Sequence, residues 1–271
     1  MSLVETNWLL ENLDNVKILD CSWHLPSSKR EAYKEYLEEH IPNTIFFDLD
    51  KNSDLETDLP HMLPKKEVWE NNLSSIGINN KDRIIIYDNS DLISSCRCWY
   101  NFLYFGHKPD MVSVLNGGLK KWKNEKKKVT KNIMNINKSN YIAQEKKNLV
   151  KSKKQIDENI IEKEFIVIDA RSRDRFNGLV SEPRKNVKSG SIQNSVCLPF
   201  TELINEDKTF KNVDEILIKF NKAIGNDNFK KIVFSCGSGV TAAVLALAYS
   251  LINNKYIPSI YDGSWAEYGK V

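Results

Sequence analysis

Residues 231–248 read KIVFSCGSGVTAAVLALA, a stretch typical of a short buried strand, a tight loop and a helix in direct succession. The residues that precede Cys236 are mostly aliphatic or aromatic, which favours a strand. Gly237 and Gly239 allow the following loop to close tightly. The apolar run after Thr241 predicts a buried helix. The stretch therefore predicts an α/β unit in which a cysteine is fixed at the end of a strand.

This position suits a reactive thiol. The start of a helix adds partial positive charge, and the backbone N–H groups of the loop can point at whatever the cysteine carries. These N–H groups belong to Gly237, Ser238, Gly239, Val240 and Thr241. Both effects stabilise a thiolate. The alternative is an ordinary core cysteine, because unpaired cysteines are among the most buried residues. A core cysteine does not need two glycines and no large side chain beside it, so we interpret Cys236 as a nucleophile.

The two halves of the chain contain the same pattern. Residues 16–20 (VKILD) parallel residues 165–169 (FIVID), residues 83–88 (RIIIYD) parallel residues 231–236 (KIVFSC), and residues 114–119 (VLNGGL) parallel residues 260–265 (IYDGSW). The offsets of 149, 148 and 146 residues are nearly constant, so one duplication explains all three pairs. These short, β-branched runs predict two α/β units, each with a mainly parallel sheet flanked by helices on both faces. Asp88 stands at the place of Cys236, so we expect the chemistry in the second unit.

A chain of 271 residues suits two domains rather than one. We expect a first domain over residues 1–130, a polar linker rich in Asn and Lys over residues 131–147, and a second domain over residues 148–271. The first domain is expected to be non-catalytic and to supply one wall of a cleft.

The composition excludes several classes of partner. The net charge of +3 is too small to indicate a nucleic acid or an anionic membrane. No stretch approaches the roughly 18 apolar residues that a membrane span needs. Five widely spread cysteines, an odd number, favour free thiols in a reducing compartment, so we expect a cytoplasmic protein.

Residues 236–242, CGSGVTA, resemble the active-site loop of the 3-mercaptopyruvate sulfurtransferases, which belong to the rhodanese superfamily. The resemblance covers nearly the whole chain and implies two tandem rhodanese-like domains, of which the second is catalytic. It also implies that Cys236 carries a sulfur atom as a covalent persulfide and that no cofactor is needed. Tyrosine-type phosphatases use a similar cysteine loop, but an arginine closes it to clamp phosphate. This chain has Ala242 there, which disfavours a phosphatase.

The resemblance further implies which residues bind the sulfur donor. In this family, the arginine of an Arg-Phe pair and the arginine of a Glu-Pro-Arg motif hold the carboxylate and the keto oxygen. They correspond to Arg175 and Arg184, nine positions apart. Arginine suits this task because its planar fork grips a carboxylate through two charge-assisted hydrogen bonds. Two further arginines, Arg171 and Arg173, are interpreted as structural or solvated.

A second cluster lies in the first half of the sequence. Residues 46–64 contain Asp50 and His61, eleven positions apart. They resemble an aspartate and a histidine that are thought to assist the loop serine of the family, here Ser238. A carboxylate, an imidazole and a hydroxyl in series could protonate a leaving enolate or polarise the donor. The alternative is that the prolines beside His61 simply pin a loop.

The sequence thus predicts a sulfurtransferase that moves sulfane sulfur from 3-mercaptopyruvate through Cys236 to cyanide, a small thiol or a thioredoxin-like protein, and that releases pyruvate. One alternative is a thiosulfate:cyanide sulfurtransferase, and another is a non-catalytic sulfur-relay or regulatory docking module. No metal is expected, because His24 and His107 have no metal-like spacing with any cysteine. Residues 262–265 (DGSW) are expected to brace the active loop rather than to touch the donor.

Overall fold

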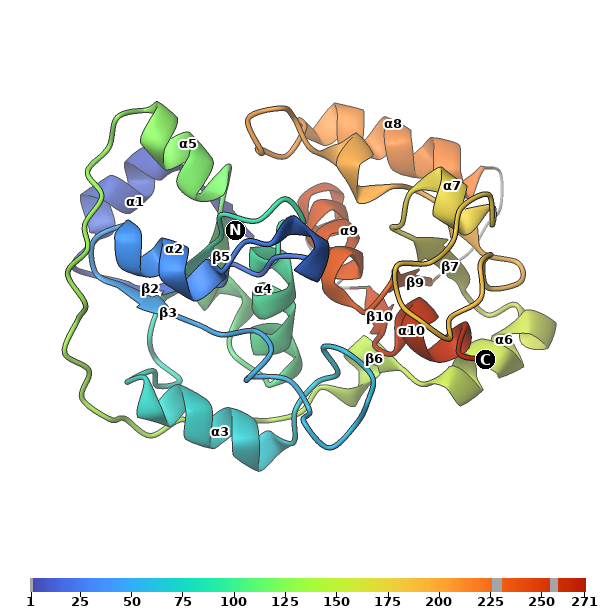
Figure 1. The fold of residues 1–271 in the computed structure, drawn as a ribbon, viewed down its shortest axis with the longest axis horizontal. Coiled ribbons are helices and arrows are strands. Elements are labelled where there is room, and N and C mark those ends of the chain that lie inside the picture. Colours follow the sequence, from blue (N-terminus) through green and yellow to red (C-terminus); the bar gives the residue numbers. More distant parts are fainter. Residues whose placement is uncertain (1, 226–230, 254–257) are drawn as a thin grey trace. The chain divides into compact units, whose positions relative to one another are not determined.

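The computed structural model describes residues 2–225, 231–253 and 258–271 of the chain (Figure 1). It contains two compact units. The first comprises Met1–Leu55, Leu63–Lys146 and Glu206–Thr209, and the second comprises Glu56–Met62, Lys147–Asn205 and Phe210–Val271. Residues 56–62, which lie in the first half of the sequence, therefore pack with the second unit.

Each unit contains strands and helices in alternation. The first unit has strands β1 (Leu3–Val4), β2 (Lys17–Asp20), β3 (Thr44–Phe46), β4 (Ile84–Tyr87) and β5 (Val112–Leu115), and helices α1 (Thr6–Asn12), α2 (Ala32–Glu38), α3 (Lys66–Ser75), α4 (Ser95–Tyr104) and α5 (Gly118–Asn124). The second unit has strands β6 (Val150–Lys151), β7 (Ile166–Asp169), β8 (Val196–Cys197), β9 (Ile232–Ser235) and β10 (Ser259–Tyr261), and helices α6 (Lys153–Glu162), α7 (Arg173–Phe176), α8 (Val213–Ile224), α9 (Val240–Ile252) and α10 (Ser264–Tyr268).

The two sheets have the same topology. The strand order is β1-β5-β4-β2-β3 in the first unit and β6-β10-β9-β7-β8 in the second, and the paired strands are parallel. The repeated sequence runs form β2 and β7, β4 and β9, and β5 and β10, which occupy equivalent places in the two sheets. The predicted duplication and the parallel α/β architecture are therefore confirmed.

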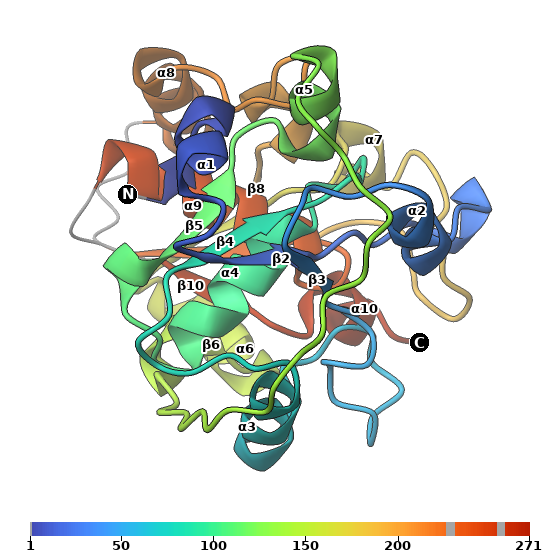
Figure 2. The same ribbon diagram turned by 90° about the vertical axis from the view of Figure 1, so that its left-hand side faces the viewer.

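In the first unit, alternate residues of each strand face opposite sides of the sheet. Ile85 and Tyr87 of β4 join a buried cluster that includes residues of α1 and α5. Helices α3 and α4 lie on the other side of the sheet (Figure 2). There the rings of Trp69 and Phe102 pack edge to face, with their centroids 5.2 Å apart. A sheet covered on both faces explains why its strands read as continuous apolar runs.

The second unit is built in the same way. Val167 and Val233 pack in a buried cluster with residues of α6 and α10. On the opposite face, Phe220 of α8 lies 6.0 Å from Phe234 of β9, measured between ring centroids. Helix α9 is buried on nearly all sides, which accounts for its uniformly apolar sequence.

The polar segment over residues 131–146 forms a strap on the first unit (Figure 2). Its backbone N–H groups donate from Ser139 to the carbonyl of Ser74 and from Gln144 to the carbonyl of Phe105, both at 2.9 Å. Tyr141 of this segment is buried and stacks on the His107 ring. Within the described ranges, no helix combines the length and the apolar character that crossing a bilayer requires.

Candidate active site

Cys236 occupies the turn between the end of β9 at Ser235 and the start of α9 at Val240. The carboxyl edge of a parallel sheet is where α/β proteins place their ligands. Gly239 caps α9 with a φ of 78°, a left-handed conformation that favours glycine. The chain after Cys236 therefore turns directly into a helix, as predicted.

The loop amides after Cys236 remain available for an anion. In the described part of the chain, the backbone N–H groups of Gly237, Ser238, Val240 and Thr241 have no hydrogen-bond acceptor. This is expected at the first turn of a helix, where N–H groups have no partner within the helix. Cys236 itself is 2% exposed, so a negative charge on its sulfur has little water to solvate it.

Helix α10 fixes the position of this loop. The N–H of Cys236 donates to Ser264 Oγ at 3.1 Å, and Ser264 is fully buried. In return, the N–H groups of Trp265 and Ala266 donate to the carbonyls of Cys236 and Gly237, both at 2.9 Å. The prediction that residues 262–265 brace the loop is confirmed.

Gly237 lies directly beside two arginine side chains. A Cβ atom placed on Gly237 would be 3.2 Å from Arg175 Nη2 and 3.4 Å from Arg184 Nη1. Two guanidinium groups from different segments thus converge on the residue next to Cys236. A side chain at Gly237 would need the ends of these two arginines to shift by a few tenths of an ångström, whereas Gly239 is favoured by its left-handed backbone conformation.

Arg175 is held by a buried carboxylate. Its Nη2 and Nε donate to the two oxygens of Glu182 at 2.5 and 3.1 Å, and the Glu182 side chain is only 2% exposed. Glu182 also accepts from Arg171 Nη1 at 2.8 Å. Arg171 in turn donates to both oxygens of Asp169 and lies 4.6 Å from the centroid of the Trp265 ring.

These four side chains form an alternating chain of charges. Burial alone would lower the pKa of Arg171, but the hydrogen bonds and the charges of Asp169 and Glu182 outweigh it and raise the pKa. The interpretation of Arg171 as structural is therefore confirmed, and Arg171 is not solvated. Glu182 belongs to the Glu-Pro-Arg motif, but the sequence analysis assigned it no role, because its partners become neighbours only on folding.

Arg184 has a different environment. Its Nη2 donates to Ser238 Oγ at 3.2 Å, and within the described residues no carboxylate lies within ion-pair distance of it. Burial lowers the pKa of Arg184, and Arg175 lowers it further, whereas negative charges on Cys236 and on the more weakly acting Glu182 oppose both effects. Arg184 is therefore a cation without a permanent counterion beside the thiol.

His61 meets Ser238 within the second unit. Nδ1 of His61 lies 2.9 Å from Ser238 Oγ, and both residues are buried. Arginine can only donate, so Ser238 Oγ accepts from Arg184 and its own proton is available for Nδ1 of His61. Asp50 belongs to the first unit, where its carboxylate accepts from Trp23 Nε1 at 3.0 Å. Asp50 therefore stays a predicted partner of His61.

Cys21, Cys96 and Cys197 have environments that disfavour a thiolate. Burial raises the pKa of Cys21 and of Cys96 well above the ordinary value. Burial and the charge of Asp169 raise the pKa of Cys197 to about 11. Cys197 is half-buried. In the described ranges, no group of three His, Cys, Asp or Glu residues is placed to hold a metal ion.

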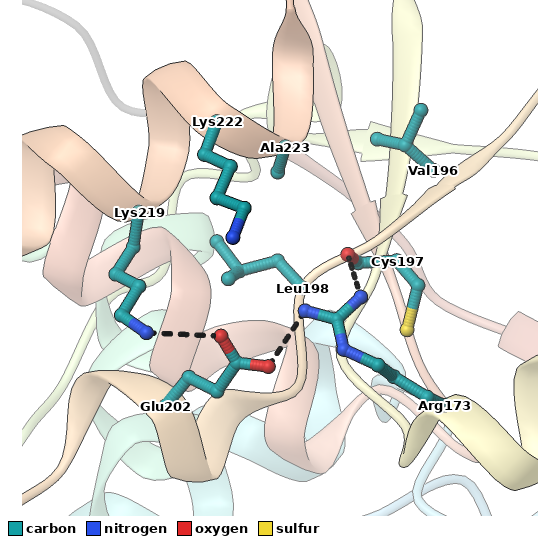
Figure 3. Close-up of a pocket in the computed structure, with 8 residues that line it drawn as sticks. All are labelled: Arg173, Val196, Cys197, Leu198, Glu202, Lys219, Lys222 and Ala223. Atoms are coloured by element: carbon teal, nitrogen blue, oxygen red, sulfur yellow. Dashed lines mark hydrogen bonds and ion pairs between the residues drawn. The ribbon is translucent and has the colours of Figure 1, made fainter.

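A separate cavity of about 510 Å³ lies in the second unit (Figure 3). It is lined by Arg173, Val196, Cys197, Leu198, Glu202, Lys219, Lys222 and Ala223. Glu202 accepts from Arg173 at 2.6 Å and from Lys219 at 3.2 Å. Arg173 is half-exposed and faces this cavity, and none of the predicted site residues lines it.

The first unit has a carboxylate at the position equivalent to Cys236. Asp88 follows β4 and is buried. Its two oxygens accept from the backbone N–H groups of Ser90 at 2.8 Å and of Ser95 at 2.9 Å. This loop holds an anion of its own and has no thiol at that position.

Comparisons with known proteins agree with this geometry. The family model described as a rhodanese-like domain matches residues 5–125 and residues 152–270. The chain is 36% identical to thiosulfate/3-mercaptopyruvate sulfurtransferase 1, mitochondrial, of Arabidopsis thaliana, over 98% of this chain and 75% of the relative. It is also 36% identical to the 3-mercaptopyruvate sulfurtransferase of Mus musculus, over 98% of this chain and 91% of the relative.

A solved structure shares the whole architecture. The crystal structure of SseA from Escherichia coli superposes on this chain with a TM-score of 0.87 at 33% identity. The match covers 98% of this chain and 99% of SseA, whose structure is described as that of a 3-mercaptopyruvate sulfotransferase. Each of the two rhodanese-like matches contains four of the five strands of one parallel sheet, and the edge strands β1 and β6 lie just before the matched residues. The chain therefore belongs to the rhodanese family of sulfurtransferases and carries two rhodanese-like domains in tandem.

Proposed function

We propose that this protein transfers sulfane sulfur from 3-mercaptopyruvate to an acceptor through a persulfide on Cys236. The observation that carries the proposal is the convergence of Arg175 and Arg184 on Gly237, the residue next to the thiol. Two arginines at this place can hold the carboxylate and the keto oxygen of a 2-keto acid while its sulfur lies at Cys236. The names of the plant and mouse relatives support the same donor.

In the first half-reaction, the Cys236 thiolate attacks the sulfur of 3-mercaptopyruvate. A new S–S bond forms, and the C–S bond breaks with its electron pair moving onto carbon as the enolate of pyruvate. The proton of the donor thiol ends on that carbon, so the products are pyruvate and an anionic persulfide. The partnerless amides of Gly237, Ser238, Val240 and Thr241, with the glycine cap at Gly239, stabilise the negative charge on either sulfur.

Ser238 and His61 are proposed to carry the proton. The Ser238 hydroxyl lies between Arg184 and His61 Nδ1, so it can take the proton of the donor thiol while its own proton moves to the imidazole. When the enolate forms, Ser238 gives a proton to its carbon and His61 returns the proton to Ser238, so both residues end as they began. Asp50 is the predicted carboxylate that orients His61. In the second half-reaction, a nucleophilic acceptor removes the outer sulfur and regenerates the thiolate. Cyanide, a small thiol and a thioredoxin-like protein are the proposed acceptors, and neither a metal nor another cofactor takes part.

Thiosulfate is a second candidate donor, because the name of the Arabidopsis relative includes it. Comparison of kcat/KM for the two donors decides between them. A large preference for thiosulfate would contradict a site built around a carboxylate.

Mass spectrometry after incubation with 3-mercaptopyruvate tests the covalent step. We expect a gain of about 32 Da, the mass of one sulfur atom, that is absent from a Cys236→Ser variant. Cys197→Ser is the matched control and should keep the mass gain. The pKa of Cys197 is raised to about 11, so this thiol should stay unmodified. No mass gain in the unsubstituted protein would favour the docking role instead.

The cytoplasm is the proposed location. The five cysteines are free, a state that is typical of reducing compartments. The Arabidopsis relative is named as mitochondrial, so cell fractionation is the appropriate test. Recovery of the protein with an organelle would contradict the proposal.

A further inference from the structure

The buried carboxylate of Glu182 sets the net charge of the donor site. Asp169, Arg171, Glu182 and Arg175 form a continuous series of ion pairs with N–O distances of 2.7, 2.8 and 2.5 Å. Two acids and two bases cancel, so this quartet contributes no net charge. Arg184, which has no carboxylate partner in the part of the chain that is described, supplies a cation for an incoming anion.

The two arginines beside Gly237 are therefore not equivalent. Arg175 is oriented by Glu182 through two hydrogen bonds and can direct N–H groups at the donor, but its charge is already balanced. Arg184 attracts the donor by charge, because no carboxylate of the described residues lies within ion-pair distance of it; the charge of Cys236 and, more weakly, that of Glu182 act on it from farther away. A site with one net positive charge matches a monoanion and leaves one charge of a dianion unbalanced.

We infer that Glu182 is a specificity-determining residue that disfavours dianionic sulfur donors such as thiosulfate relative to the monoanionic 3-mercaptopyruvate. The inference rests on the proposed function, because it concerns the choice of donor at the same site. Glu182 does not touch the donor. It acts through its charge, one guanidinium group away from the anion that Arg175 and Arg184 hold.

The size of the effect follows from the distances. Glu182 Oε2 lies 2.5 Å from Arg175 Nη2, which is itself 3.2 Å from the Cβ position of Gly237. We therefore place the carboxylate at about 7 Å from the bound anion. With an effective dielectric constant between about 20 and 40, one extra unit charge at that distance changes relative affinity roughly 7- to 50-fold.

The test is the ratio of kcat/KM for thiosulfate to kcat/KM for 3-mercaptopyruvate in a Glu182→Gln variant. Glutamine keeps the size and one hydrogen-bond acceptor but removes the charge. We expect the ratio to rise at least 7-fold. The matched control is Glu202→Gln, which removes a carboxylate that pairs with Arg173 and Lys219 in the separate cavity of Figure 3, and there the ratio should stay within twofold.

A charge effect and a positional effect are separated by Glu182→Asp, which keeps the charge but shortens the side chain. Both values of kcat/KM should fall in this variant while their ratio stays within twofold. The inference is overturned if the ratio is unchanged in Glu182→Gln, or if it rises equally in Glu182→Asp, since displacement of Arg175 would then be sufficient.

A binding measurement keeps the test independent of turnover. In a Cys236→Ser background, calorimetry compares pyruvate as the monoanion with thiosulfate as the dianion, and Glu182→Gln should strengthen thiosulfate binding more than pyruvate binding. Equal changes for both ligands would contradict the inference. If the unsubstituted protein forms no persulfide with either donor, the proposed function fails, whereas an active enzyme with an unshifted ratio rejects only the role of Glu182.

Discussion

Replacement of Arg184 by glutamine should separate donor binding from folding. Arg184 makes one hydrogen bond, to Ser238, and no ion pair in the described structure. Burial lowers its pKa, which means that the folded protein disfavours its charge. The Arg184→Gln variant no longer has the energetic cost of burying this charge, and that gain offsets the lost hydrogen bond to Ser238. We therefore expect the free energy of unfolding of Arg184→Gln to stay within about 1 kcal/mol of the original value.

Activity should respond much more strongly. A charge-assisted hydrogen bond to a carboxylate is worth about 2–3 kcal/mol, which corresponds to roughly a 30- to 150-fold loss of kcat/KM for 3-mercaptopyruvate. Arg175→Gln provides the contrast, because it removes an ionic partner from the buried Glu182 side chain, which is 2% exposed. That variant should lose about 2 kcal/mol of unfolding free energy as well as activity.

Two measurements check this reasoning. Pyruvate release under steady-state conditions gives kcat and KM for each variant, and urea denaturation followed by fluorescence gives the free energy of unfolding. The reasoning is wrong if Arg184→Gln is destabilised as much as Arg175→Gln. It is equally wrong if Arg184→Gln keeps the original kcat/KM for 3-mercaptopyruvate.

Two further predictions concern the loop and the first unit. Gly237→Ala should raise KM for the keto-acid donor roughly tenfold with little change in stability. The reason is that the new methyl group displaces the flexible ends of Arg175 and Arg184 by a few tenths of an ångström. An unchanged KM would contradict the proposed contact. Burial raises the pKa of Asp20 to about 7 from 3.8, so the unfolded chain loses this proton near pH 4 and the folded protein near pH 7. As the pH rises through this interval, Asp20 withdraws up to about 1.4 kcal/mol of stability per pH unit. The free energy of unfolding of Asp20→Asn should not show this decrease. Urea denaturation at pH 4 and at pH 7 measures the difference in unfolding free energy between the variant and the original protein, and an equal difference at both pH values would contradict the prediction.

The fold was accessible from the sequence because the central strands are buried on both faces. Such strands leave continuous β-branched runs, and the runs recur at a nearly constant offset. The edge strands left no comparable signal, since β1, β6 and β8 contain two residues each. Nor does any sequence pattern indicate that residues 56–62 pack with the second unit, because that depends on the path of a loop.

The candidate site likewise contains features that could be predicted from the sequence and features that could not. The loop from Cys236 to Thr241 is local in sequence, so its strand-loop-helix geometry could be predicted. The role of Glu182 could not, since it depends on Arg171 and Arg175, which come within hydrogen-bond distance of it only when the chain folds. Ser264 was likewise quoted as part of a brace without a specific partner, and the structure identifies that partner as the N–H of Cys236.

The loops that follow β4 and β9 occupy equivalent positions in the two units, but Asp88 makes them differ in whether they can bind an external anion. In the first unit, the Asp88 side chain accepts from the backbone N–H groups of Ser90 and Ser95, so these two donors are not available to an external anion. In the second unit, the amides of Gly237, Ser238, Val240 and Thr241 have no acceptor among the described residues, so they are available to the persulfide charge that we propose on Cys236. A single exchange of aspartate for cysteine is therefore not enough to make the first loop catalytic. Arg30 donates to the carbonyl of Asn89 in the first loop, but its guanidinium is already paired with Glu35, so a cation free to meet an incoming donor would also be needed there.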